Sequence, residues 1–313
     1  MGFPSFDLAA FEAMQGGARI AGAARLDEIC QSSGFLVLTG HGVPRNVIEA
    51  QWHAVRQFFA LPPDRKAKVA APYPGYPYGW LAEKSEALAA SRGVVTPPDL
   101  KESFNGGPLA VPQGIEDPEA YAFCYQPTLW PDVSGFQGAW AAYYRCMEDL
   151  AARIMAAFAE ALGLDADHFE QAISTPISAL RALRYPPTGG QAEIGQQRAG
   201  AHTDYGSLTI LLPQPGSSGL QIEQTGEWVD VPAPEGAFVV NIGDLMARWT
   251  ADRWVSTLHR VVVRPDQPER LSLAFFHQPN WMAEIAPLDG SGRYEPVRSG
   301  PYLMAKFRAT SAR

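Results

Sequence analysis

From about residue 178 to residue 277 the sequence is a succession of short β-type segments, and this stretch limits the possible fold most strongly. Each segment holds apolar and β-branched residues over six to nine positions. Turn sequences such as 186–190 and 215–219, rich in Pro, Gly and Ser, separate them. Several short strands punctuated in this way predict an antiparallel sandwich or barrel. The segments are residues 179–185, 207–213, 219–224, 227–232, 237–243, 256–264 and 270–277.

The part before this stretch mixes helical and strand signals. We expect a strand at 35–39, and an ordered loop with short helical turns over the Gly-, Pro- and aromatic-rich residues 70–135. Helices are predicted at 21–31, 45–59 and 139–162. No linker or repeat interrupts the chain, so we predict one co-folded α+β unit over 1–313 with a mainly β core. Its N-terminal region is 1–120 and its catalytic β-region is 175–280.

Composition and charge exclude several classes of partner. The net charge is −8 and no run of Lys or Arg occurs, which disfavours nucleic acid and anionic membranes as partners. No apolar stretch reaches the roughly 18 residues of a membrane span, and the acidic N-terminus is unlike a signal peptide. Three dispersed cysteines predict free thiols rather than disulfides or a thiolate metal site. We therefore expect a soluble cytoplasmic protein, for which a monomer is plausible.

His202 and Asp204 form the only His-x-Asp pair among the six histidines. On an extended segment, residues i and i+2 project from the same face, so the pair offers two ligands to one ion. His259 follows 55 residues after Asp204, several strands later, where a barrel can bring it alongside. Two imidazoles and one carboxylate leave coordination positions open, which is typical of Fe(II) oxygenases rather than of structural zinc sites.

The segment after His259 predicts a carboxylate-binding group. A turn sequence at 264–268 suggests a hairpin in which His259 faces Ala274. In that register Arg270 and Ser272 point to the same side as His259. A buried arginine requires an anionic partner, and Arg binds carboxylates through two parallel hydrogen bonds. The sequence therefore predicts a carboxylate site beside the metal.

These residues resemble the 2-oxoglutarate and Fe(II)-dependent dioxygenases of the isopenicillin N synthase-like family. That family has His-x-Asp, about 55 residues, His, about ten residues and Arg-x-Ser, the pattern that His202, Asp204, His259, Arg270 and Ser272 form. The resemblance extends over nearly the whole chain, because residues 34–44, 183–187 and 240–245 also look like segments of the family.

The resemblance implies a distorted double-stranded β-helix, a cupin-like jelly roll, flanked by helices. It implies Fe(II) at His202, Asp204 and His259, with 2-oxoglutarate as cosubstrate and O2 as oxidant. Arg270, Ser272 and Tyr185 would bind the distal carboxylate of 2-oxoglutarate. The implied reaction oxidises a small molecule, in most cases by hydroxylation, and releases succinate and CO2.

Two alternatives stay open at this point. An oxidase like isopenicillin N synthase shares the triad and Arg-x-Ser but uses no 2-oxoglutarate. A non-catalytic module that binds metal or 2-oxoglutarate on the same barrel is the other. The substrate cannot be read from the sequence, although Lys101 and Arg184 are the basic residues that we would test first for substrate contact.

Overall fold

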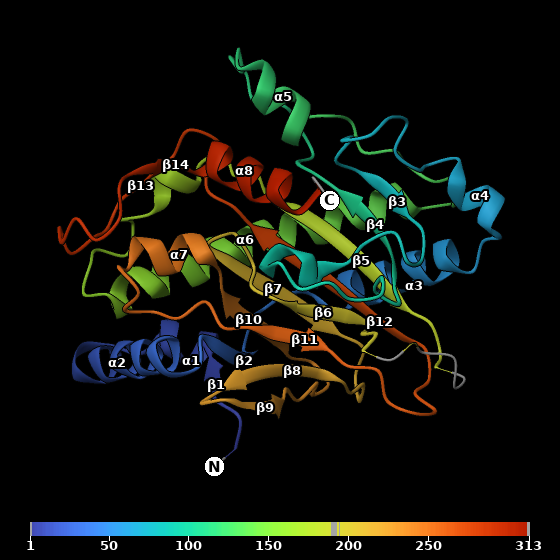
Figure 1. Ribbon diagram of the computed structural model, residues 1–313. Coiled ribbons are helices and arrows are strands. Elements are labelled where there is room, and N and C mark those ends of the chain that lie inside the picture. The colour runs from blue at the N-terminus through green and yellow to red at the C-terminus, as the bar shows by residue number, and fades with distance from the viewer. Residues whose placement is uncertain (1, 189–192, 194, 312–313) are drawn as a thin grey trace.

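The computed structural model describes residues 2–188, 193 and 195–311, and its centre is a pair of facing sheets (Figure 1). Within these residues the larger sheet has the order β1-β2-β10-β7-β12-β5-β4-β3, and the smaller has the order β6-β11-β8-β9. All neighbouring strands are antiparallel except β1 and β2. The larger sheet comprises β1 (Ser5–Asp7), β2 (Phe35–Thr39), β3 (Gly79–Leu81), β4 (Glu102–Gly106), β5 (Ala179–Tyr185), β7 (Leu208–Pro213), β10 (Phe238–Ile242) and β12 (Arg270–His277). The smaller comprises β6 (Ala199–His202), β8 (Leu220–Gln224), β9 (Glu227–Asp230) and β11 (His259–Val261), and β13 (Glu284–Ile285) pairs separately with β14 (Val297–Arg298).

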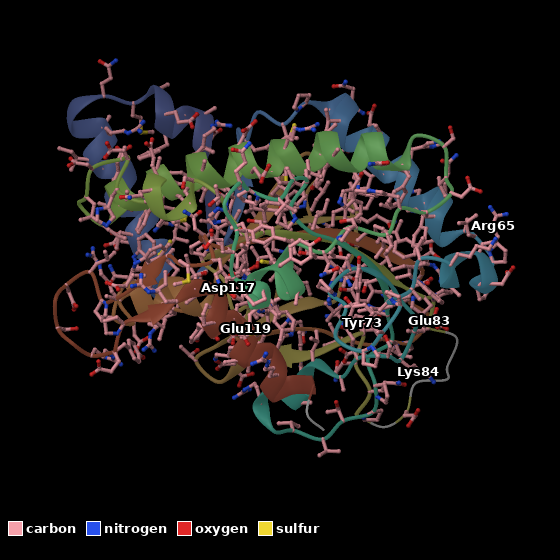
Figure 2. All side chains as sticks on the ribbon, turned by 90° about the horizontal axis from the view of Figure 1, so that it is seen from above. Arg65, Tyr73, Glu83, Lys84, Asp117 and Glu119 are labelled. Carbon is pink, nitrogen blue, oxygen red and sulfur yellow. The ribbon has the colours of Figure 1, made fainter. Side chains whose placement is uncertain are left out.

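Helices cover the outer face of the larger sheet. Figure 2 shows a layer of helices on one side of the sheets, with α6 (Phe136–Ala161) between the sheet and α2 (Gly16–Ser32) and α3 (Arg45–Phe59). In α6 buried side chains such as Tyr143, Met147 and Ile154 recur at helical spacing, which is why this segment packs as a helix against the sheet. The other helices are α1 (Leu8–Ala13), α4 (Pro63–Ala67), α5 (Pro118–Cys124), α7 (Asp244–Trp249), α8 (Ser299–Ser311) and the 3-10 helices η1 (Leu88–Arg92) and η2 (Glu170–Ile173).

Alternation along β12 divides the molecule into two cores. Leu271, Leu273 and Phe275 join the large core under the helices, whereas Ala274 joins a smaller core between the two sheets. Arg270 and Ser272 share the face of Ala274, because residues two apart in a strand point the same way. The inner face of the larger sheet therefore carries polar side chains at one end.

The predicted α+β fold with antiparallel sheets is confirmed, and most predicted elements occur. The strand at 35–39 is β2, the helix at 45–59 is α3, and the helix at 139–162 is α6. The interpretation of 70–135 as loop was wrong in part, because β3 and β4 extend the larger sheet beside β5. β3 has only three residues and β4 has one large apolar residue, Phe104, so neither segment shows an alternation of apolar and polar residues. The turn predicted at 186–190 runs into residues outside the described ranges.

Two smaller observations bear on the sequence predictions. All three cysteines are free thiols, and Cys30 and Cys124 are buried. In the described part of the chain, no helix combines the length and apolar character that crossing a bilayer requires.

Candidate metal centre and carboxylate pocket

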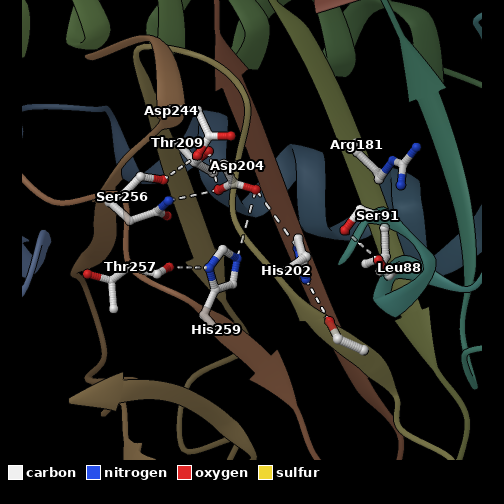
Figure 3. A network of polar contacts seen from close by, with 12 residues as sticks. Leu88, Ser91, Arg181, His202, Asp204, Thr209, Asp244, Ser256, Thr257 and His259 are labelled. Atoms are coloured by element: carbon white, nitrogen blue, oxygen red, sulfur yellow. Dashed lines mark hydrogen bonds and ion pairs between the residues drawn. The ribbon is translucent and has the colours of Figure 1, made fainter. Parts of the chain in front are cut away.

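The smaller sheet brings three side chains that could bind a metal to one point. His202 is the last residue of β6, Asp204 lies two residues after it, and His259 is the first residue of β11. The two strands pair so that His202 and His259 lie opposite each other. The Nε2 atoms of His202 and His259 are 3.9 Å and 3.8 Å from Oδ1 of Asp204 (Figure 3). One ligand atom from each residue lies within 4.8 Å of the others, so this group could hold a metal ion.

Backbone carbonyls fix both imidazoles in the orientation that a metal requires. Nδ1 of His202 is 2.7 Å from the Gly200 carbonyl oxygen, and Nδ1 of His259 is 3.1 Å from the Thr257 carbonyl oxygen. Because a carbonyl only accepts, each Nδ1 carries the proton and each Nε2 keeps a lone pair for coordination. Burial, together with the neighbouring His259, lowers the pKa of His202 to about 3, so its imidazole is neutral at physiological pH.

The carboxylate of Asp204 is oriented by two donors on its far oxygen. Thr209 Oγ1 and Asn241 Nδ2 donate to Oδ2 at 2.6 Å and 2.8 Å, which leaves Oδ1 directed at the imidazoles. Burial alone would raise the pKa of Asp204, but the two imidazoles and these hydrogen bonds outweigh it and lower the pKa. Two imidazoles and an ionised carboxylate on one side of an ion match the ligand set of open non-haem Fe(II) sites.

A second group of polar side chains lies on the inner face of β12. Arg270 is 3% exposed, and its contacts include a 3.3 Å hydrogen bond from Nε to Ser217 Oγ and the Tyr185 ring, 5.0 Å from the guanidinium carbon. Among the described residues, Nη1 of Arg270 and Oγ of Ser272 have no hydrogen-bond partner. Burial lowers the pKa of Arg270, which reflects the cost of a buried cation. Unsatisfied buried donors around a guanidinium fit a carboxylate ligand.

The predicted hairpin between His259 and Ala274 was wrong. β11 pairs with β6 and β8, whereas β12 pairs with β5 and β7 in the other sheet. Arg270 lies opposite Tyr185, and Ala274 lies opposite Arg181 and Leu211. The predicted alternation along 270–276 was right, so Arg270, Ser272 and His259 still face one interior, but they converge from two facing sheets instead of one ribbon.

Two family models match this chain, one in each half. The 2OG-Fe(II) oxygenase superfamily matches residues 176–279, and the family described as non-haem dioxygenase in morphine synthesis N-terminal matches residues 3–133. Validamycin A dioxygenase of Streptomyces hygroscopicus subsp. limoneus is 33% identical over 97% of this chain and 85% of its own length. The chain belongs to the 2OG-Fe(II) oxygenase superfamily.

Solved structures agree with this membership. A full-length Neurospora crassa protein in complex with alpha-KG and thymine superposes with a TM-score of 0.85 at 29% identity, over 99% of this chain and 97% of that one. JOX2 in complex with 2OG, Fe and JA gives a TM-score of 0.78 at 26% identity, over 97% and 85% of the two chains. The protein is thus a 2-oxoglutarate-dependent non-haem Fe(II) dioxygenase, with Fe(II) and 2-oxoglutarate as its cofactors. This membership favours a 2-oxoglutarate-dependent dioxygenase over the oxidase and the non-catalytic module that the sequence left open.

Arg181 lies beside the triad of this oxygenase, on the side of His202 away from His259 (Figure 3), and belongs to a cluster of charged side chains. Arg181, on the inner face of β5, donates from Nε to Asn105 at 2.6 Å and from Nη1 to Glu86 at 3.3 Å. Lys101 pairs with Glu86 and Asp99 at 3.3 Å and 3.2 Å. Burial would raise the pKa of Glu86, but Arg181 and Lys101 lower it to about 2. Glu86 is therefore ionised near the metal site.

The structure separates the two basic residues that the sequence singled out. Lys101 is 3% exposed and belongs to this cluster. Arg184 points to the opposite face of β5, where it pairs with Glu102 and Glu269 at 2.7 Å, so the interpretation of Arg184 as a substrate contact was wrong. Sequence reasoning missed Arg181, although its spacing of four from Tyr185 places both on one face of the strand.

Proposed function

We propose that this enzyme hydroxylates an unactivated carbon of a small organic molecule. The balanced reaction is R–H + O2 + 2-oxoglutarate → R–OH + succinate + CO2, in which one oxygen atom enters the product and the other enters succinate. Fe(II) held by His202, Asp204 and His259 would supply the redox chemistry of this coupled oxidation. The other roles fall to side chains that bind, orient and shield.

The observation that carries the proposal is the pairing of two half-sites in one interior. The triad offers two imidazoles and one carboxylate with open positions. On the facing sheet, Arg270 Nη1 and Ser272 Oγ are buried donors without partners among the described residues. We propose that a 2-oxo acid spans these half-sites, with its distal carboxylate at Arg270, Ser272 and Tyr185. The Tyr185 ring and the small side chain of Ala274 give the extended ligand an apolar wall.

The charged cluster beside His202 supports a polar substrate. Nη2 of Arg181 has no partner among the described residues, whereas Nε and Nη1 are held by Asn105 and Glu86. A guanidinium fixed on one edge presents its free edge in a defined direction. We propose that Arg181 contacts a carbonyl, hydroxyl or carboxylate oxygen of the substrate and so sets which carbon reaches the metal. The structure of the Neurospora crassa protein holds thymine and that of JOX2 holds JA, both small molecules.

A substrate screen tests the proposal. Purified protein with Fe(II), O2 and 2-oxoglutarate is incubated with panels of small polar molecules, and succinate is measured. A true substrate raises succinate formation and yields a product heavier by one oxygen atom, which is labelled when 18O2 is used. A product that is lighter than the substrate by two hydrogen atoms would show that the enzyme desaturates its substrate instead of hydroxylating it. Succinate formation with no stimulated product across acids, nucleobases, sugars and terpenoids would contradict a small-molecule oxygenase.

A further inference from the structure

A second buried arginine, Arg198, lies near Arg270. Arg198 directly precedes β6 and is 1% exposed, which makes it one of the largest fully buried side chains of the described residues. Its backbone N–H donates to the Val261 carbonyl, which fixes it to β11 two residues from His259. It is neither one of the triad residues nor part of the Arg-x-Ser sequence.

The hydrogen bonds of Arg198 place its guanidinium beside the carboxylate pocket. Nη2 donates at 2.8 Å to the carbonyl oxygens of Pro186 and Pro268. Pro186 directly follows Tyr185, and Pro268 precedes Arg270 by two residues, while Tyr185 and Arg270 lie opposite each other. The guanidinium of Arg198 therefore lies between the two backbone segments that lead to Tyr185 and Arg270. These two residues and Ser272 form the proposed carboxylate clamp.

Within the described ranges, no carboxylate balances the charge of Arg198. Its Nε is buried and has no partner among the described residues, and Nη2 is held by two neutral carbonyls. Burial and repulsion from Arg270 lower its pKa, and Tyr185 is the one group that opposes this. No carboxylate contributes to the pKa of either arginine in the described residues, and the residues outside those ranges include no Asp or Glu.

Two buried guanidiniums that repel each other are expensive unless a ligand supplies negative charge. Other buried cations of this chain have such partners, since Lys66 pairs with Glu102 at 2.7 Å and Lys101 pairs with Asp99. Only neutral groups surround Arg198 in the described part of the chain, apart from Arg270 itself. We propose that Arg198 is a second cation of the 2-oxoglutarate pocket, and that the distal carboxylate binds in the combined field of Arg198 and Arg270. This inference rests on the proposed position of 2-oxoglutarate.

A ligand pair isolates the interaction with the distal carboxylate. 2-Oxoglutarate and 2-oxopentanoate share the 2-oxo acid group, but 2-oxopentanoate ends in a methyl group. Dissociation constants are measured anaerobically on the Fe(II)-loaded protein by calorimetry, together with iron content and the unfolding temperature. The ratio of the two constants reports only what the distal carboxylate gains.

Two substitutions separate the charge of Arg198 from its hydrogen bonds to the loops. Arg198→Lys keeps a cation, whereas Arg198→Gln keeps N–H donors without charge. We expect Arg198→Gln to weaken 2-oxoglutarate binding about 10- to 100-fold, the size of one charge-assisted contact, with 2-oxopentanoate changed less than about threefold. Arg198→Lys should keep most of the ratio. The control variant Arg264→Met should keep all of it, because the Arg264 side chain is partly exposed and already pairs with Asp230.

The outcomes are distinct. Equal loss of the ratio in the Lys and Gln variants would mean that Arg198 only ties the two proline segments, and an unchanged ratio in both would remove it from the pocket; either result overturns the inference. If Arg198→Gln does not fold, Arg198→Met, which also removes the charge, takes its place in the comparison with Arg198→Lys, and a ratio unchanged in both of these variants, or lost equally in both, overturns the inference. A wild-type protein that binds both ligands equally would instead refute the clamp at Arg270, and the inference with it.

Discussion

Replacing Arg270 by Met should make the ligand-free enzyme more stable and nearly insensitive to 2-oxoglutarate. Arg270 is a cation at 3% exposure that is held by a 3.3 Å hydrogen bond to the neutral Ser217. Replacing even a buried ion pair by apolar side chains of similar volume is often neutral or stabilising by about 1–4 kcal/mol, so replacing a buried charge without a charged partner should stabilise the ligand-free protein. An unfolding temperature a few degrees higher is therefore expected for the ligand-free variant.

The same substitution removes the partner of the distal carboxylate. Two charge-assisted hydrogen bonds, at about 1.5–3 kcal/mol each and reduced by desolvation, make a loss of about 3 kcal/mol or roughly 100-fold in Kd. With 2-oxoglutarate at about 100 times the wild-type Kd, the wild type gains about 2.7 kcal/mol of stability, and a 100-fold weaker variant gains about 0.4 kcal/mol.

Thermal unfolding of Fe(II)-loaded protein under argon, with and without 2-oxoglutarate, measures both effects. Arg264→Met serves as the control, because it makes the same exchange at a half-exposed arginine that pairs with Asp230. A variant that is destabilised without ligand, yet still gains the wild-type increment from 2-oxoglutarate, would refute the reasoning that Arg270 is an unpaired cation awaiting a carboxylate.

Three further predictions follow from individual contacts. Asn241→Ala removes a hydrogen-bond donor to Asp204 and should weaken iron binding about 10- to 100-fold, as measured by chelator competition. The affinity of the iron-loaded variant for 2-oxoglutarate should change little. Unchanged iron affinity would contradict the orienting role of Asn241. Arg181→Met should raise the KM of a substrate found in the screen at least about tenfold while uncoupled succinate formation persists, and an unaltered KM would place the substrate elsewhere. Burial raises the pKa of Glu148 from 4.5 to about 7, so the folded state holds an extra proton between these values and stability falls as pH rises through them. The free energy of unfolding of Glu148→Gln, relative to that of the wild type, should therefore rise by about 1 kcal/mol between about pH 5 and about pH 8, a value reduced to allow for the partial exposure of Glu148. Urea unfolding measures this difference, and a difference that does not change with pH would contradict the prediction.

The sequence predicted the ligand set and the fold class because both depend on local spacing. Alternation placed Arg270 and Ser272 on one face, and the His-x-Asp spacing placed two ligands together, whichever strands lay beside them. The pairing of β12 with β5 and β7 could not be derived, because the turn at 264–268 is equally compatible with a hairpin and with a passage between sheets. The roles of the triad and clamp residues stay proposals, as do the single-unit domain organisation and the cytoplasmic location.

The groups that orient the site were harder to predict than the site itself. Thr209 reaches Asp204 from β7, across the loop that follows Asp204. Asn241 reaches it from β10, which lies more than 30 residues later in the sequence. One signal was present, since Asn241 is a polar residue inside the apolar strand Phe238–Ile242, where it needs a buried partner. Arg198 offered no such signal, because its surroundings form only when the ends of β5 and β12 come together.

The most direct test of the central claim is the visible absorption of the Fe(II)-loaded protein titrated anaerobically with 2-oxoglutarate. If the triad and the arginine clamp form one site, a new charge-transfer band appears and saturates at about one 2-oxoglutarate per bound iron, and a His259→Ala variant shows none. A protein that holds iron through the triad but develops no band at saturating 2-oxoglutarate would contradict the account.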